Sequence, residues 1–412
     1  MARYSIRRLL LSTREAWQAE LGKSHSFHIE MVYDHGRRYS WILKVTAPHQ
    51  PITPELFREF SLWGITCWPA SPATAYLFTE PAALVELTHR QNFTSQEETF
   101  AAELAAFLER EQRARFILNS SQKTLEIGSR TLIMGVLNCT PDSFSDGGLY
   151  LNKEAAIERG LRMMEQGADI IDVGGESTRP AGTYGEGAQP VSEAEEMERV
   201  LPVIEALAKT ASCLLSVDTY KSAVAEAAIR AGAGMVNDVS GFRFDPQMSA
   251  VVARHGTPAV IMHIKGTPRD MQQNPSYENL MDELYQFFER QLEAAQGAGI
   301  VREQIILDPG LGFGKQLRDN YEILQRLEEF RGLGCPLLVG PSRKSFIGTV
   351  LELPVHERLE GTAAVVALAV AHSAHIVRVH DVKEMRRVVK IADVITGRTP
   401  LQSASRTIGG AA

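Results

Sequence analysis

The carboxyl-terminal two thirds of the chain alternate short apolar runs with longer stretches in which apolar residues recur at helical spacing. An apolar run without polar alternation indicates a strand that is buried on both faces, which is typical of a parallel sheet covered by crossover helices. The predicted strands are Leu132–Leu137, Ile170–Val173, Leu214–Val217, Met235–Asn237, Ala259–Met262, Ile305–Leu307, Leu337–Val339 and Ile376–Val379. The predicted helices include Lys153–Gln166, Glu193–Lys209, Lys221–Ala231, Tyr277–Gln296 and Asp319–Leu327.

Eight predicted strands separated by crossover sequence favour a closed (β/α)8 barrel, the TIM barrel. An open doubly wound sheet is the alternative, because hydrophobic periodicity does not show whether a sheet closes on itself. We therefore predict an α/β chain with two domains. Residues 1–120 form a small α+β domain, and residues 121–412 form the (β/α)8 TIM barrel.

The first 120 residues have a different pattern. Ser26–Tyr33, Tyr39–Thr46 and Ala75–Phe78 are strand-like, and the first two suggest a hairpin. A long helix is expected from Thr94 to about Phe116. All the tryptophans lie here, and we predict that they are core residues, with an interface patch as the alternative; they are Trp17, Trp41, Trp63 and Trp68. No catalytic motif is found in this part, so its function is unassigned.

Composition narrows the function and the compartment. The 412 residues carry a net charge of −7, with 44% hydrophobic and 23% charged residues, which is ordinary for a soluble globular protein. We expect no nucleic-acid and no membrane partner, because the chain is not basic and no apolar run reaches the ~18–20 residues of a membrane span. The four cysteines are widely spaced without a CxxC pair, which favours the cytoplasm. The arginine-rich start leaves a transit peptide as an alternative, against which its acidic residues count.

Polar residues follow the predicted strands. The active site of a (β/α)8 barrel forms at the carboxyl ends of its strands. One polar residue after one strand is often a loop cap, but here such a residue follows each strand, which favours a functional interpretation. These residues are Asn138, Glu176–Arg179, Asp218, Asn237, His263, Lys265, Asp308, Ser342–Lys344, Arg378 and His380.

Asp218, Asn237 and Asp308 are suited to holding a planar heterocycle. A carboxylate only accepts hydrogen bonds, so it matches a ligand edge with adjacent N–H donors, and asparagine offers a donor and an acceptor. The alternative is that these side chains cap the helices that follow, and this alternative is strongest for Asp218.

The second kind of polar residue is cationic. Arg378 and His380 are two apart on one strand and therefore point the same way. With Lys344, Arg343 and Arg179 they predict an anion site for phosphate or pyrophosphate, and Asn138 offers an oxygen that could help to seat Mg²⁺. We find no Ser/His/Asp or Cys/His arrangement that would supply a nucleophile.

At this point residues 131–398 are seen to resemble dihydropteroate synthase, a family of pterin-binding enzymes. The matching segments are LNCTPDSFSDGG at 137–148, GADIIDVGGESTRP at 167–180, SVDTYK at 216–221, NDVSG at 237–241, MHIKGTPRDMQ at 262–272, LDPGLGFGK at 307–315, SRKSFIG at 342–348 and RVHDV at 378–382. All eight occur in order, and the family fold is the (β/α)8 barrel that the pattern predicts.

The resemblance implies condensation of 6-hydroxymethyl-7,8-dihydropterin pyrophosphate with 4-aminobenzoate to 7,8-dihydropteroate and pyrophosphate, in folate biosynthesis. It implies a Mg²⁺ cofactor, a cytoplasmic homodimer and a target of sulfonamides. By resemblance, the pterin would be held by Asp218, Asn237, Asp308 and Lys344, and the pyrophosphate with its metal by Asn138, Arg378 and His380. Thr178 and Arg179 would lie on a loop over the site, and Phe144, Phe313 and Ser342 near the aminobenzoate.

Two alternatives and one departure accompany this interpretation. A methyltetrahydrofolate:corrinoid methyltransferase would share the pterin-holding residues, but the SRKS and RVHDV segments argue against it. A non-catalytic pterin-binding paralogue would be expected to lack Lys344, Arg378 or His380, and all three are present. The departure is Ala181, which stands where the family usually has glycine and opens a longer second loop.

Overall fold

The computed structural model describes residues 4–11, 14–21, 39–47, 51–52, 56, 61, 64–89, 95–140, 149–177 and 190–401. The chain forms two compact units. The first comprises residues 1–114, 276–297 and 321–335, and the second comprises residues 115–275, 298–320 and 336–412. The division differs from the predicted one, since two segments between barrel strands belong to the first unit.

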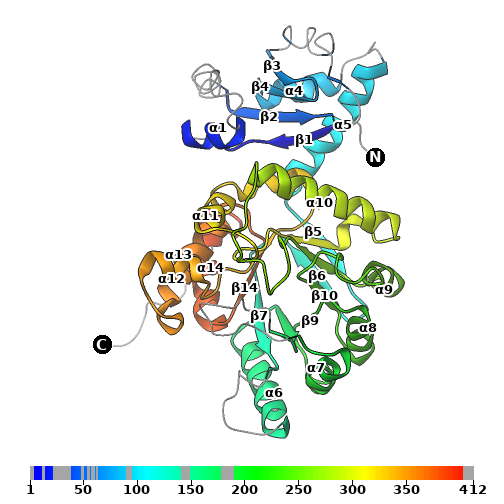
Figure 1. Ribbon diagram of the computed structural model, residues 1–412, viewed down its shortest axis with the longest axis vertical. Helices are drawn as coiled ribbons and strands as arrows, with labels where there is room; N and C mark the ends of the chain where they lie inside the picture. Colours follow the sequence, from blue (N-terminus) through cyan, green and yellow to red (C-terminus); the bar gives the residue numbers. More distant parts are fainter. Residues whose placement is uncertain are drawn as a thin grey trace. The chain divides into compact units, whose positions relative to one another are not determined.

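The second unit is built on a parallel sheet. Among the described residues its order is β12-β11-β10-β9-β8-β7-β14-β13. Its strands are β7 Leu132–Asn138, β8 Ile170–Gly174, β9 Leu214–Asp218, β10 Met235–Asp238, β11 Ala259–Met262, β12 Ile305–Asp308, β13 Leu338–Val339 and β14 Ile376–Val379. A parallel bridge between Leu307 and Leu337 joins the two ends of this order. The sheet therefore closes into the predicted (β/α)8 barrel, and the open doubly wound alternative is wrong (Figure 1).

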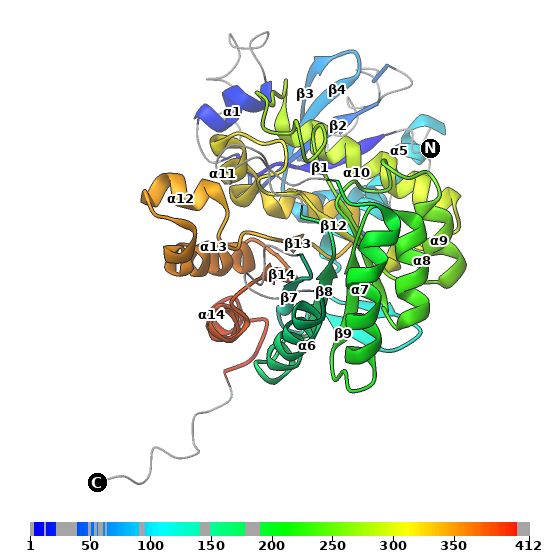
Figure 2. The ribbon, with the colours of Figure 1, turned by 60° about the horizontal axis from the view of Figure 1, so that its bottom comes forward.

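Helices cover the outside of the barrel strands, as the views of α6, α7 and α8 show (Figure 2). Local signals set their ends: the Ser192 hydroxyl accepts from the amide of Glu195 at the start of α7, and Gly256 ends α9 in the left-handed region. The helices of this unit are α6 Leu149–Glu165, α7 Glu193–Ala208, α8 Ser222–Ala231, α9 Met248–His255, α12 Ser345–Leu351, α13 Leu359–Ala371 and α14 Val382–Ile395, and α11 Leu317–Gln325 contains the unit boundary. Short 3-10 turns occur at η4 Arg302–Gln304 and η6 Val355–Glu357.

A hairpin closes the amino-terminal end of the barrel. β5 Phe116–Asn119 and β6 Thr124–Ile127 pair antiparallel, and their buried residues share one core with residues of all eight barrel strands. The sequence analysis missed this hairpin. The helix expected to reach about Phe116 ends at Gln112, and Phe116 instead begins β5. This core leaves the opposite end of the strands for the site.

The first unit contains a four-stranded antiparallel sheet in the order β1-β2-β4-β3. Its strands are β1 Ser5–Arg8, β2 Trp41–Thr46, β3 Thr66–Ser71 and β4 Thr74–Thr79, and its helices are α1 Arg14–Leu21, α4 Pro81–Thr88, α5 Ser95–Gln112 and α10 Leu280–Gly297, followed by the 3-10 turn η5 Leu327–Leu333. β2, β4 and the predicted long helix confirm three expected elements. The expected strand Ser26–Tyr33 lies outside the described residues.

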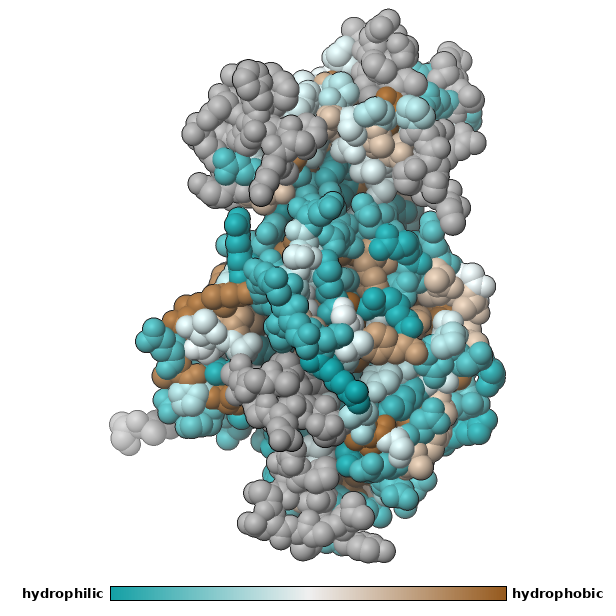
Figure 3. All heavy atoms as spheres, in the orientation of Figure 1, coloured by the Kyte–Doolittle hydropathy of each residue, from teal (hydrophilic) through white to brown (hydrophobic). Residues whose placement is uncertain are grey.

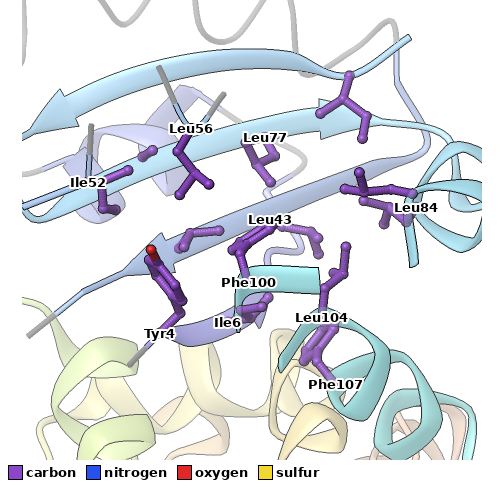
Figure 4. Close-up of a cluster of buried hydrophobic side chains, with 14 of the residues drawn as sticks. Tyr4, Ile6, Leu43, Ile52, Leu56, Leu77, Leu84, Phe100, Leu104 and Phe107 are labelled. Carbon is purple, nitrogen blue, oxygen red and sulfur yellow. The ribbon is translucent and has the colours of Figure 1, made fainter. Parts of the chain in front are cut away.

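Alternating residues of the sheet fill two cores on its two faces. Leu43 and Leu77 pack with Phe100 and Phe107 of α5 in the larger core (Figure 4). The other face holds Trp17, Tyr76, Phe78 and their neighbours, and Trp17 is 1% exposed. Trp17 is therefore a core residue, as predicted. No helix among the residues that the structure describes has the length and apolar character of a membrane span.

Buried charges join the distant segments of this unit. Glu20 accepts from Arg7 at 2.7 Å and Lys44 at 2.8 Å through Oε1, and from Arg326 at 2.8 Å through Oε2. Glu329 accepts from Arg7 at 2.7 Å and from Arg326 at 2.6 Å. Burial by itself would raise the pKa of Glu20, but the three cations outweigh it and hold that pKa well below its usual value. These bonds explain why segment 321–335 belongs with the amino-terminal residues.

Candidate active site

A cavity of about 210 Å³ lies at the carboxyl ends of the barrel strands. Seven of the residues to which the family resemblance assigns a ligand line it: Asn138, Asp218, Phe313, Ser342, Lys344, Arg378 and His380. Asn237 and Asp308 end β10 and β12 and are 4% and 5% exposed. The fold thus brings together nine predicted residues that are spread over more than half of the chain, because all parallel strands end at the same rim.

Arg378 lies at the centre of a chain of hydrogen bonds. Its Nε donates to Oδ2 of Asp172 at 2.7 Å, and its Nη2 donates to Oδ2 of Asp218 at 2.6 Å. The same oxygen of Asp172 accepts from Nδ2 of Asn237 at 2.8 Å. Asp172 was missed by the sequence analysis, because it stands inside an apolar strand; its charge within that run was the available signal.

The contacts of Asp218 differ from those of a helix cap. Its carboxylate pairs with Arg378, whereas Thr219 accepts from the amide of Lys221 at 3.2 Å and Asp245 accepts from the amide of Ser222 at 2.8 Å, at the start of α8. Thr219 and Asp245 therefore cap the start of α8, and the alternative that Asp218 is the cap is wrong. Burial raises the pKa of Asp218 to about 7, although Arg378 opposes the rise.

Asp308 and Lys344 are the other coupled pair of the site. Burial raises the pKa of Asp308, and the charge of Lys344 opposes that rise. Burial lowers the pKa of Lys344 to about 8 against the attraction of Asp308. The Lys344 ammonium donates to the carbonyl of Leu311 and lies 4.7 Å from the ring centroid of Phe313.

Ser342 and His380 meet at the cavity wall. The Ser342 hydroxyl lies 3.0 Å from Nδ1 of His380 and accepts from the His380 amide at 3.2 Å. Arg343, predicted among the anion-binding cations, forms a two-bond pair with Asp381 at 2.9 and 2.5 Å. Arg343 also lines the cavity, with its guanidinium paired to Asp381.

Comparison of this chain with known proteins identifies its family. The sequence pattern described as pterin binding enzyme matches residues 134–380. This chain belongs to that family. It is 48% identical to the dihydropteroate synthase of Synechocystis over 275 residues, which are 66% of this chain and 93% of that protein. The match leaves about one third of the present chain outside it.

Solved structures agree with this pterin-binding assignment. The Yersinia pestis dihydropteroate synthase in a sulfonamide drug complex is 43% identical with a TM-score of 0.64, over 68% of this chain and 99% of that chain. The Xanthomonas albilineans dihydropteroate synthase in complex with 7,8-dihydropteroate is 37% identical with a TM-score of 0.61, over 68% of this chain and 98% of that chain. At 43% and 37% identity, both structures share sequence as well as fold with this chain.

The pterin-binding barrel holds two further polar clusters, around Glu176 and His263, whose partners Lys221 and Lys315 the sequence analysis did not single out. Glu176 lines the cavity and is held by the ammonium of Lys221 and by the hydroxyl of Tyr220 at 2.9 Å. Lys221 also donates to Glu196 at 2.5 Å and to the carbonyl of Val191 at 2.8 Å. Lys221 was assigned to a helix from its sequence, and only the packing of β8 against β9 shows its partners.

The second cluster supports the turn that carries Phe313. Lys315 is 2% exposed and donates to the carbonyls of His263 and Phe313 at 3.2 and 3.0 Å, with its Nζ 3.0 Å from Nδ1 of His263. Burial lowers the pKa of Lys315 to about 7. Gly310 and Gly314 have positive φ, and a Cβ at either would lie 2.0 and 2.3 Å from the carbonyl oxygens of residues 263 and 265. Glycine is therefore required for this close approach.

The site of this family member can be tested for the implied metal. Among the described residues no group of three or more His, Cys, Asp or Glu side chains could hold a metal ion. Mg²⁺ is often bound by one or two protein oxygens together with substrate phosphates and water. The single oxygen of Asn138, in the same cavity wall as Arg378 and His380, fits that mode.

Three predicted residues, Phe144, Thr178 and Arg179, lie outside the described residues, as does the expected second loop from Ala181. Their roles remain predictions from the sequence.

Proposed function

We propose that this protein condenses 6-hydroxymethyl-7,8-dihydropterin pyrophosphate with 4-aminobenzoate, which yields 7,8-dihydropteroate and pyrophosphate in folate biosynthesis. The observation that carries the proposal is the meeting of acceptor groups and anion-binding cations in one cavity. Asp218 and Arg378 are joined there by a 2.6 Å bond. The Xanthomonas albilineans relative bound to 7,8-dihydropteroate supports the choice of product.

Pyrophosphate departure is assisted by preformed positive charge. Arg378 cannot lose its proton at neutral pH, and two buried carboxylates hold its guanidinium in the cavity wall. His380 lies two residues further along the same strand end and is oriented by Ser342. Charges fixed where the leaving group develops negative charge lower the barrier without later reorganisation.

The pterin fragment that remains is a cation delocalised into the ring. Asp218 and Asp308 are acceptors beside that position, and both can hold the N–H groups of the heterocycle. The amine of 4-aminobenzoate then attacks the methylene carbon and loses a proton. No covalent enzyme intermediate is required, in agreement with the absence of a nucleophile motif in the sequence.

Asn138 would hold Mg²⁺ together with the pyrophosphate oxygens. A bound magnesium ion supplies Lewis acidity, which neutralises charge on the leaving group. Removal of metal ions with a chelator should therefore abolish the activity, and added Mg²⁺ should restore it.

Phe313 and Ser342 are proposed to contact 4-aminobenzoate, since both line the cavity beside Lys344. The sulfonamide complex of the Yersinia pestis relative supports binding of these drugs by this protein. We therefore expect sulfonamides to compete with 4-aminobenzoate and not with the pterin.

We also propose a homodimer in the cytoplasm. Apolar residues gather over α12 and α13 at the left of Figure 3. Leu368, Ile391 and Ile395 of α13 and α14 are 58%, 64% and 79% exposed around an apolar groove. A patch of this kind is typical of a subunit interface. Sedimentation should give twice the mass of 45.5 kDa, and Ile391→Glu should give the monomer mass. The four cysteines are free thiols in the structure, and free thiols persist in a reducing compartment.

The function is tested by incubating the purified protein with the pterin pyrophosphate, 4-aminobenzoate and Mg²⁺. Dihydropteroate and pyrophosphate should form in equal amounts. Pterin binding without any product would contradict the proposal and favour a non-catalytic pterin-binding protein.

A further inference from the structure

Among the residues that the structure describes, Asp172 is the one fully buried carboxylate that touches two predicted ligand-binding residues. It lies in the middle of β8 and is 0% exposed. Its Oδ2 accepts from Nε of Arg378 at 2.7 Å and from Nδ2 of Asn237 at 2.8 Å. One oxygen therefore holds both Arg378, which is predicted to bind the pyrophosphate, and Asn237, which is predicted to bind the pterin.

The bond to Asn237 fixes which end of an amide faces the ligand. An ionised carboxylate only accepts hydrogen bonds, so Asp172 binds the NH₂ of Asn237 and not its oxygen. The two ends of an amide point apart, and Oδ1 of Asn237 is therefore turned away from Asp172. Asp218 and Asp308 are acceptors as well, so the site presents acceptors to the edge of the heterocycle.

The bond from Arg378 to Asp172 fixes the orientation of the guanidinium in the predicted pyrophosphate site. Arg378 uses Nε for Asp172 and Nη2 for Asp218, so two strands hold one guanidinium in one orientation. A guanidinium is a planar fork whose remaining donors then point in a set direction. Asp172 is therefore placed to align Arg378, predicted to bind the pyrophosphate, with Asn237, predicted to bind the pterin.

The second oxygen of Asp172 shows that the carboxylate is not arranged for stability alone. In the part of the chain that the structure describes, Oδ1 is buried and has no hydrogen-bond partner. Glu20, by contrast, bonds through both oxygens. A buried oxygen without a partner costs stability, so another property keeps a carboxylate at this position.

We propose that Asp172 is a positioning residue that sets the specificity of the site, because it orients the Asn237 amide as an acceptor for a donor-bearing pterin edge and aligns Arg378 with the pyrophosphate. The inference rests on the proposed function. It adds a residue that selects the ligand without being required to touch it.

The test uses the full chain and two substitutions. Asp172→Asn removes the charge and lets either end of the Asn237 amide face residue 172. The exchange Asp172→Asn/Asn237→Asp restores a fixed bond between the two positions and an acceptor at 237, but it keeps the carboxylate away from Arg378. Asp169→Asn is the matched control directly before the same strand, because Asp169 pairs with Arg130 at 2.5 Å at the opposite end of the barrel.

Selectivity is measured with 6-hydroxymethylpterin against its 2-oxo analogue, in which an acceptor replaces the amino group. A site built to accept from N–H groups should prefer the pterin by about 100-fold or more. Asp172→Asn should reduce this ratio at least ~10-fold and weaken inorganic pyrophosphate binding by a similar factor, in line with the loss of a charged hydrogen bond. The exchange variant should recover the ratio but not pyrophosphate binding. Asp169→Asn should change neither.

An unchanged ratio in Asp172→Asn, or an exchange variant that recovers neither quantity, would overturn the inference. If Asp172→Asn does not fold, the exchange variant alone decides, since it keeps the net charge. A wild-type protein that binds these ligands selectively but makes no dihydropteroate would contradict the proposed function and leave the role of Asp172 standing.

Discussion

Two buried groups of charges in this chain differ in how completely their members are paired. In the first unit both oxygens of Glu20 are bonded, and the carboxylate faces three cations. In the barrel, Asp218 faces one guanidinium that it shares with Asp172. The Glu20 side chain is fully buried and the Asp218 side chain is 14% exposed, yet the pKa of Glu20 falls while the pKa of Asp218 rises to about 7.

The difference follows from the number of opposite charges for each carboxylate. Desolvation opposes ionisation in both groups, and only a surplus of close cations reverses its effect. The first unit has that surplus, so its charges hold segments together. The barrel site lacks it, and its carboxylates gain most from a ligand that brings N–H donors. The comparison separates charges that serve folding from charges that serve binding.

The largest expected effect is that of removing the amino-terminal residues. A chain that begins at Arg115, and so keeps the β5–β6 hairpin of the barrel, would leave Glu329 and Arg326 without Arg7 and Glu20, and would expose the apolar surface that α5 covers, including Gly332 against Phe107. We expect a protein that does not fold cooperatively, measured by circular dichroism on heating. A soluble and fully active barrel would contradict the assignment of segments 276–297 and 321–335 to the first unit.

Glu20→Gln should lower the free energy of unfolding by about 3–5 kcal/mol, because it leaves several buried cations without their shared partner. Urea unfolding measures the change. Glu111→Gln is the control in the same unit: burial raises the pKa of Glu111 to about 7, so an amide replaces a group that is already partly neutral. A smaller loss for Glu20→Gln than for Glu111→Gln would break the comparison. The KM for the pterin substrate should not change in either variant.

Arg378→Ala should reduce kcat by about 100- to 1000-fold, because it removes a fixed charge from the leaving-group position. Binding of 6-hydroxymethylpterin, which has no phosphate, should change only a few-fold by calorimetry, since the bond between Asp172 and Asn237 remains. Equal losses of turnover and pterin binding would refute the anion-site role. Arg130→Ala removes an arginine that pairs with Asp169 away from the cavity, and it should leave kcat unchanged.

The smallest expected effect concerns pH. The pKa of Asp218 is raised to about 7, so kcat/KM should rise with pH through this value as the carboxylate ionises. The same shift means that folding stability from this group is fully present below the unfolded pKa near 4 and is lost as pH rises through about 7. Glu196 raises the pKa of Asp218 by repulsion, and Glu196→Gln should therefore move the acidic limb to lower pH. A shift to higher pH would assign the limb to another group.

Most of the barrel could be predicted from the sequence, because parallel strands that are buried on both faces consist of continuous apolar runs. All eight predicted strands agree with the structure to within one residue at each end, and Leu337, the predicted first residue of β13, forms the closing bridge. The hairpin β5–β6 was missed because its alternating pattern is short and follows a helix without a strong stop signal.

The site was predicted in part. Residues at strand ends could be found because the end of an apolar run marks the rim of the barrel, and Asp218 and Arg378 are such residues. Asp172 could not be found this way, since it lies within a strand and its importance depends on contacts with residues 237 and 378. Lys315 was likewise hidden, because its partner His263 lies 52 residues away in the sequence.

The sequence by itself determined the barrel, the rim that carries the chemistry and the family, because periodicity and local motifs are properties of neighbouring residues. Only the tertiary structure decided which charges are paired and which are left for a ligand. It also decided that residues 276–297 and 321–335 belong to the amino-terminal unit. The pairing of Glu20 with Arg326, or of Asp172 with Arg378, spans hundreds of residues. Such a pairing depends on burial and on distances that exist only once the chain has folded.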